Sequence, residues 1–213
     1  MAFFSTDELQ PTGKTREPMA ELEARKQAIR LPTGADGAYL LHLFVDEPIP
    51  SELRQYCVSD DKITADFQAG SGDIAFGGLE STFSDFAPNP NIRADAKITP
   101  GTYRATAYRT EYPEELIEDV IEQAIGAEGA KKLEFPGTII MITVGLVLVL
   151  PLLMVMLFQS LPVAALTAGA SIAGGVVSFR KYTGTDEFRT LSKRSEDAQR
   201  QYPSIVIELD AAP

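Results

Sequence analysis

The chain has 213 residues, of which 45% are hydrophobic, and a formal net charge of −11. A chain of this length usually forms one domain of ordinary size rather than two. Because binding to phosphate groups needs a basic surface that releases counterions, the acidic balance argues against nucleic acid as a partner.

The charge is unevenly distributed along the chain. Residues 135–179 form a run of 45 residues without Asp, Glu, Lys, Arg or His. The part before this run contains 13 Lys and Arg against 24 Asp and Glu, whereas the part after it contains six of each. The acidity therefore belongs to the N-terminal part, as suits a domain that is kept off an anionic membrane surface or that faces a basic partner.

Residues 1–16 are expected to be a flexible leader. They lack the basic region, apolar core and cleavage site of a signal peptide, so we expect the N-terminus to remain in the cytosol. The Gly-Lys-Thr at residues 13–15 also occurs in phosphate-binding loops, but Glu8 stands where such a loop has its first glycine, and no apolar strand comes before it.

Residues 17–134 are predicted to form one soluble domain. Met19, Leu22 and Ile29 indicate a helix over 18–31, and the apolar run 38–45 indicates a buried strand. Alternating side chains predict half-buried strands over 62–68 and 102–110. The glycines at 70 and 72 predict a hairpin turn into a strand over 73–76. The loop over 84–95 is a candidate partner-binding loop.

A helix is predicted to begin at Pro113, with an apolar stripe between residues 116 and 125. Its opposite side carries four acidic residues, which are Glu114, Glu115, Glu118 and Glu122. A solvated face is the ordinary explanation of such a stripe. The alternative is a docking surface for a basic partner.

Two stretches within the uncharged run predict a transmembrane hairpin over 135–179. A membrane span needs about 20 apolar residues, and residues 138–158 satisfy this alone. Residues 162–179 are shorter and richer in small residues, so their own insertion is weak. The alternative is a buried hairpin of a soluble core, which the rest of the chain is too short to cover.

Small residues recur every four positions in the second stretch and form two ridges on the predicted helix. Such ridges allow another helix backbone to approach closely. The partner is either the first span or a second copy of the protein. The two ridges comprise Ala165, Gly169 and Ala173, and Ala170, Gly174 and Ser178.

The basic residues around the hairpin predict its orientation. Lys131 and Lys132 precede the first span, Arg180 and Lys181 follow the second, and the turn over 159–161 is uncharged. By the positive-inside tendency, both termini are expected in the cytosol, at the inner or plasma membrane if the source is bacterial. The cytosolic tail 180–213 contains a predicted strand at 204–209 that returns to the soluble domain.

Candidate catalytic residues are few. His42 is the only histidine and lies within a predicted strand, where a packed or hydrogen-bonded side chain is the ordinary interpretation. Cys57 is the only cysteine, so an intrachain disulfide is impossible. A hydrolase that uses His42 or Cys57 is the weakest hypothesis because neither residue lies in a recognisable motif. We expect no metal site and no cofactor.

The sequence therefore predicts a cytosolic α+β domain with a mostly antiparallel sheet and a two-helix transmembrane hairpin. The leading functional hypothesis is a membrane-anchored, non-enzymatic protein-interaction module, such as an immunity protein or an accessory subunit of a membrane complex. Its expected partners are the lipid bilayer and either another membrane-associated protein or a second copy of the chain. The alternative is a homo-oligomeric membrane-remodelling or pore-forming protein.

Overall fold

The structure is a computed structural model that describes residues 1–33, 39–83, 93–158 and 161–212. It divides into two compact units. The sandwich unit comprises Met1–Tyr112 and Tyr202–Pro213, and the helical unit comprises Pro113–Gln201. The chain thus leaves the sandwich unit, forms the helical unit and then returns.

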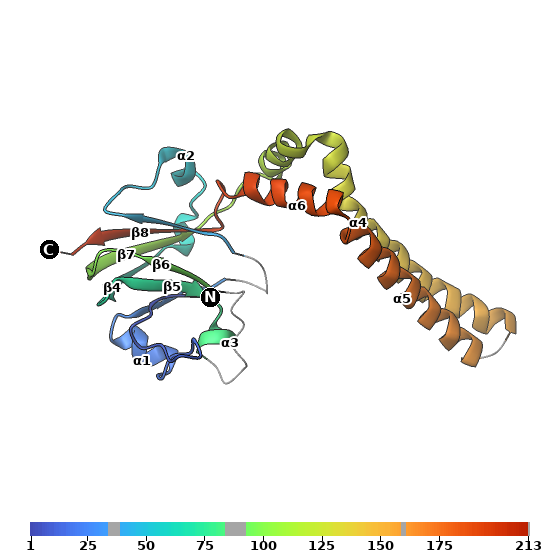
Figure 1. The fold of residues 1–213 in the computed structure, drawn as a ribbon, viewed down its shortest axis with the longest axis horizontal. Coiled ribbons are helices and arrows are strands. Elements are labelled where there is room, and N and C mark those ends of the chain that lie inside the picture. Colours follow the sequence, from blue (N-terminus) through green and yellow to red (C-terminus); the bar gives the residue numbers. More distant parts are fainter. Residues whose placement is uncertain (34–38, 84–92, 159–160, 213) are drawn as a thin grey trace. The chain divides into compact units, whose positions relative to one another are not determined.

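The sandwich unit contains two four-stranded sheets (Figure 1). One is antiparallel throughout, in the order β2 (Ala28–Arg30), β1 (Ala2–Ser5), β5 (Asp73–Gly77) and β6 (Arg93–Lys97). The other is mixed, in the order β3 (Leu41–Val45), β8 (Ile205–Ala211), β7 (Gly101–Arg109) and β4 (Ile63–Ala69). Within it, β3 runs parallel to β8, whereas the other neighbours are antiparallel. The predicted α+β class with mostly antiparallel sheets is confirmed.

The two sheets share one apolar core because each strand turns alternate side chains toward it. Phe3 of β1 packs on Phe67 of β4 across the two sheets, with ring centroids 4.7 Å apart. Strand β8 contributes Ile205, Ile207 and Leu209, all at most 4% exposed. The C-terminal strand is therefore an interior strand of the mixed sheet and a large part of its core.

Short helical segments and loops cover the outer faces of the sheets. Met19 and Leu22 of α1 (Met19–Ala24) pack with Phe4, and α3 (Leu79–Thr82) follows β5. The outer face of the mixed sheet is covered in part by α2 (Ser51–Arg54), which a short 3-10 helix, η1 (Ser59–Asp61), follows. There Tyr108 and Val206 pack against residues 49 and 53.

The predictions for the first 31 residues are partly wrong. Residues 2–5 do not belong to a flexible leader: they form β1, and Phe3 and Phe4 are buried. The predicted helix over 18–31 ends early because Lys26 adopts a positive φ of 62° and Ile29 pairs with Phe3 in the sheet. Propensity for a helix is weaker than the gain from pairing and burying these apolar side chains.

The predicted hairpin at residues 70–72 is also wrong. Strands β4 and β5 are consecutive, yet they belong to different sheets, so this segment crosses between the sheets. Asp7 stabilises this crossing segment, because its two carboxylate oxygens accept hydrogen bonds from the Ser71 N–H at 3.3 Å. The predicted binding loop over 84–95 lies mostly outside the described residues, and its last three residues belong to β6.

An aromatic contact marks the place where the chain leaves the sandwich unit and returns to it. The rings of Tyr112 and Tyr202 meet edge to face with centroids 5.3 Å apart. The Tyr112 hydroxyl donates a hydrogen bond to the Pro203 carbonyl at 3.1 Å, and the Tyr56 ring also packs on Tyr112. The two crossing points are therefore adjacent and tied together within the sandwich unit.

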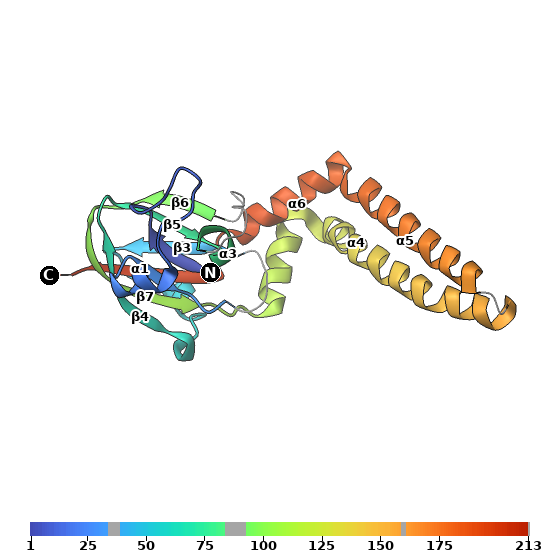
Figure 2. The ribbon, with the colours of Figure 1, turned by 90° about the horizontal axis from the view of Figure 1, so that it is seen from below.

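The helical unit consists of α4 (Glu114–Phe158), α5 (Leu161–Thr183) and α6 (Asp186–Gln199). Helix α5 runs antiparallel beside the second part of α4 (Figures 1 and 2). Helix α6 packs on the part of α4 around Gly129, where a Cβ atom would lie 3.1 Å from Leu191 Cδ2. Residues 113–134 and 180–201 thus belong to this unit, which corrects the domain boundaries predicted at 134 and 180.

Composition identifies one candidate membrane span among the described residues. This is α4, whose most apolar 18-residue window has none of its residues buried. The same test finds no second such helix in the described ranges. Of the two predicted spans, only the one within α4 is therefore long and apolar enough by composition over the residues described.

Candidate functional site

The most unusual surface of the protein lies on α4 and α5. Large apolar side chains project outward along both helices, among them Met141, Leu148 and Met156 of α4, which are 67–77% exposed. On α5, Leu166 and Val177 are 74% and 64% exposed. A continuous apolar surface of this extent on a soluble protein marks a site that binds a membrane or another apolar partner.

Helices α4 and α5 approach most closely at Gly175. A Cβ atom at this position would overlap the Thr143 side chain and lie 2.9 Å from its Cβ. The Thr143 hydroxyl donates a hydrogen bond to the Ile139 carbonyl in its own helix at 2.7 Å, and its oxygen is the atom nearest to the Cβ position on Gly175. The missing side chain of Gly175 therefore permits this packing, as small residues do between membrane helices.

The two predicted small-residue ridges lie beside this line of closest approach. Ala165, Gly169 and Ala173 are exposed, and a Cβ atom on Gly169 would meet nothing within 4 Å. The second ridge lines a groove between the helices with Ala170, Gly174 and Ser178. Sequence reasoning missed Gly175, although Ser171, Gly175 and Phe179 share the same four-residue spacing.

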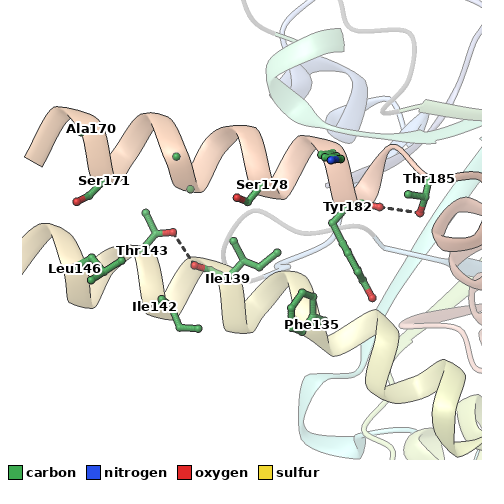
Figure 3. Close-up of a pocket in the computed structure, with 13 residues that line it drawn as sticks. Phe135, Ile139, Ile142, Thr143, Leu146, Ala170, Ser171, Ser178, Tyr182 and Thr185 are labelled. Atoms are coloured by element: carbon green, nitrogen blue, oxygen red, sulfur yellow. Dashed lines mark hydrogen bonds between the residues drawn. The ribbon is translucent and has the colours of Figure 1, made fainter.

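The groove between α4 and α5 has a volume of about 660 Å³ (Figure 3). Ile139, Ile142 and Leu146 of α4 form one wall, and the ridge with Ala170 and Gly174 forms the other. Lys181, Tyr182 and Thr185 lie at one end. On the other side of the helix pair, a smaller groove of about 340 Å³ ends at Arg180.

Aromatic and charged side chains gather at this end of the helix pair. The Tyr182 ring packs on Phe135 at 4.9 Å and on Phe188 at 5.7 Å between centroids. Its hydroxyl donates a hydrogen bond to the Lys132 carbonyl at 3.1 Å. Lys132 in turn pairs with Glu187 at 2.7 Å, and hydrogen bonds to Glu187 and Glu128 raise its pKa. We call this set of residues the basal cluster.

The four glutamates predicted as a docking surface lie on the first part of α4. All four are exposed, and they precede Gly126, where a φ of 74° and a ψ of 159° break the helix. Glu118 and Glu122 also line a hollow that includes Lys131 and Glu134. The four glutamates are therefore accessible, but the positively charged Lys131 lies close to Glu118 and Glu122.

The candidate catalytic residues lie in the sandwich unit. His42 alternates with the inward-facing Leu41 and Leu43 of β3, so it lies on the outer face of the mixed sheet. Burial raises the pKa of the Cys57 thiol, as does Glu208, while Arg54 opposes the shift. A raised pKa favours the thiol over the thiolate, which is the reverse of what an activated nucleophile needs. Among the described residues, no group of three potential ligands could hold a metal ion.

One strand differs from the other strands at the sheet edges. β3 lies at the edge of the mixed sheet and contains no charged residue, whereas the described edge strands β2, β4 and β6 each contain at least one. No described residue pairs with β3 on the side away from β8. Charged residues protect sheet edges against pairing with other chains, so β3 is the least protected of these edges.

No family model, no curated protein and no solved structure matches this chain.

Proposed function

We propose that this protein is a membrane-anchored, non-enzymatic protein-interaction module. In this proposal α4 and α5 cross the bilayer as a two-span hairpin, and the sandwich unit works in the cytosol. The unburied apolar surface of α4 carries the proposal. Each large apolar side chain removed from water contributes about 1.5–3 kcal/mol, so a bilayer stabilises this surface strongly.

The dimensions of the helices support a complete crossing. Residues 138–158 span about 31 Å at about 1.5 Å per residue, close to the thickness of about 30 Å of a bilayer's hydrocarbon core. The α5 helix runs alongside this stretch and supplies the second crossing. Its small residues insert weakly alone, so the packing at Gly175 provides the additional stabilisation.

The basal cluster supports the position of the hairpin in the membrane. Aromatic rings concentrate at membrane interfaces, and Lys and Arg flank spans on the cytosolic side. Phe135, Tyr182 and Phe188 lie at one end of the helix pair, where the basic residues of both flanks also lie. We therefore place this end at the cytosolic interface.

The free edge of β3 is the surface that we propose for a protein partner. An extended segment of the partner would add a strand beside Leu41–Val45, with backbone hydrogen bonds supplying affinity. The outward side chains His42 and Phe44 would contact alternate residues of that strand. The raised pKa of Cys57 favours this interaction role over a hydrolase.

One observation favours a second candidate function, an oligomeric membrane-remodelling assembly. The ridge of Ala165, Gly169 and Ala173 is exposed, so a second copy could approach it. After purification in mild detergent, a stoichiometric foreign partner would favour the interaction module. A homogeneous large homo-oligomer would favour the assembly instead.

Reporter fusions test the topology. A reporter at either terminus should read as cytosolic, and one inserted at residue 160 should read as external, because the basic residues flank only the two outer ends of the hairpin. An external signal from either terminus would contradict the orientation. Release of the chain from vesicles by sodium carbonate would contradict the membrane anchor itself.

A photo-crosslinking amino acid at His42 or Phe44 tests the proposed partner surface. It should capture a protein partner in cells, whereas the same probe at Asp66 of β4 should capture none, because Asp66 pairs with Lys26 within the sandwich unit at 2.8 Å. Equal capture from both sites would remove β3 from the proposal.

A further inference from the structure

The groove between α4 and α5 ends at the positive charge of Lys181. At the basal end, Lys132 already pairs with Glu187 and Glu128. The hydroxyls there are also engaged, since Tyr182 donates to the Lys132 carbonyl and Thr185 donates to the Tyr182 carbonyl at 2.8 Å. Lys181 is exposed and has no ion pair with a described carboxylate, so its ammonium can receive an anion.

The remainder of the groove is apolar and open. Ile142 and Leu146 border it on α4 (Figure 3). A Cβ atom on Gly174 would meet nothing within 4 Å. Ser171 does not add a free donor, because its hydroxyl bonds to the Thr167 carbonyl at 2.9 Å. The groove therefore suits a hydrocarbon chain along its length and a negative group only at its basal end.

The length of the groove distinguishes a lipid from a further helix. From Ala170 to Lys181 it covers 11 helical steps, or about 16 Å at about 1.5 Å per residue. This is close to half of the hydrocarbon core, the depth of one leaflet, whereas a spanning helix needs about 30 Å. The groove thus matches a lipid from the leaflet at its basal end better than a helix from a second copy.

We infer that this groove binds one anionic phospholipid, with an acyl chain between α4 and α5 and the phosphate at Lys181. Basic pockets between membrane helices on the cytosolic side hold such headgroups, and anionic lipids are enriched in that leaflet. The inference rests on the membrane hairpin of the proposed function. It adds a defined lipid ligand to a surface that otherwise contacts bulk lipid.

Two variants and two matched controls test separately how the charge of the groove and its shape contribute to lipid binding. Lys181→Gln removes the cation, and Gly174→Leu fills the groove at an open position. Lys131→Gln removes the same charge from the basic flank of the first span, at a position that does not line the groove. Gly169→Leu adds the same side chain to α5 at an open position that does not line the groove.

The full chain is reconstituted into nanodiscs of phosphatidylcholine and phosphatidylglycerol, released in mild detergent and weighed by native mass spectrometry. Wild type and both controls should retain one phosphatidylglycerol in preference to phosphatidylcholine. Lys181→Gln should lower this retention about fivefold, the effect of one basic residue near a membrane surface, and Gly174→Leu should lower it at least as much.

The outcomes distinguish the lipid site from the membrane anchor. If sodium carbonate releases the wild-type chain from vesicles, both the anchor and the lipid site are overturned. If the chain stays embedded but Gly174→Leu and Lys181→Gln retain as much phosphatidylglycerol as wild type, only the lipid site is overturned. Disulfide formation between two copies through a cysteine introduced at Gly174 would also overturn it, because a second helix would then occupy the groove.

Discussion

Gly175 shows how a single absent side chain determines the packing of two helices. Its position opposite Thr143 leaves no room for a methyl group, whereas Gly169 and Gly174 on the same helix have open space. The three glycines therefore have different roles despite their similar sequence surroundings. Gly175 differs from the other two because it faces Thr143 of the neighbouring helix.

We expect Gly175→Leu to weaken the packing of α5 on α4 by about 1–3 kcal/mol, since overpacking forces the backbones apart. Fluorophores attached to the two helices should separate at a lower SDS fraction in mixed micelles. Gly169→Leu is the matched control and should leave that transition unchanged. Equal destabilisation by both variants would show that Gly175 is not the point of closest approach.

Asp7 provides a pH-dependent contribution to the sandwich unit. Burial raises the pKa of Asp7, but hydrogen bonds from Ser71, Ser5 and the backbone at Gly70 together lower it below its ordinary value of 3.8. The folded state therefore favours the carboxylate. Its stabilisation is complete above the unfolded pKa and is lost as the pH falls through the folded pKa.

Asp7→Asn should lower the stability of the sandwich unit at pH 7 by about 0.5–1 kcal/mol, because the site is solvent-screened. Thermal unfolding followed by circular dichroism should show that the difference from wild type shrinks as the pH falls below 3.8. A constant difference from pH 7 to pH 2.5 would mean that the charge of Asp7 does not contribute.

At the scale of the element, β8 is the strand on which the mixed sheet depends. It pairs with β3 in parallel and with β7 antiparallel, so it contributes hydrogen bonds on both sides. Ile207 is fully buried, whereas Asp210, near the end of the same strand, is exposed. This difference provides an internal comparison within one strand.

Ile207→Ala should destabilise the sandwich unit by about 2–5 kcal/mol through the lost burial and the cavity that remains. Asp210→Ala should change stability by no more than about 0.5 kcal/mol. Limited proteolysis of the full chain in membranes should accelerate only for Ile207→Ala. Unchanged protection would show that β8 is dispensable for the fold.

At the scale of the whole molecule, the helical unit is an insertion in a fold that is complete without it. The chain leaves at Tyr112 and returns at Tyr202, and the rings of these two residues touch at 5.3 Å between centroids. Both sheets and the shared core come entirely from the residues outside the insertion. The helical unit is thus inserted between Tyr112 and Tyr202 of the sandwich unit.

Replacing residues 113–201 by a short Gly-Ser linker should therefore yield a folded protein that is soluble without detergent. The linker has little distance to cover, because the Tyr112 hydroxyl lies 3.1 Å from the Pro203 carbonyl. Size-exclusion chromatography should give a monomer, and thermal unfolding should be cooperative. Aggregation, or a loss of β-sheet signal in circular dichroism, would show that the sandwich unit needs the helices.

Features that depend on local composition can be predicted from the amino-acid sequence alone. The uncharged run of 45 residues predicts the exposed apolar helix, because the tendency to leave water adds up along a segment whatever surrounds it. Alternation similarly identified β4 and β7, and the run 204–209 corresponds to β8. In each case the pattern that predicts the element is formed by residues that are neighbours in the sequence.

The choice of which segments pair and pack together depends on the folded structure. The sequence predicts a flexible leader at Phe3 and a helix at Ile29, yet both residues belong to strands that pair with each other, because the pairing buries both side chains. The crossing at residues 70–72 and the contact of Gly175 with Thr143 likewise depend on residues distant in sequence. Pairing and close packing are properties of two surfaces together, so one segment read alone cannot specify them.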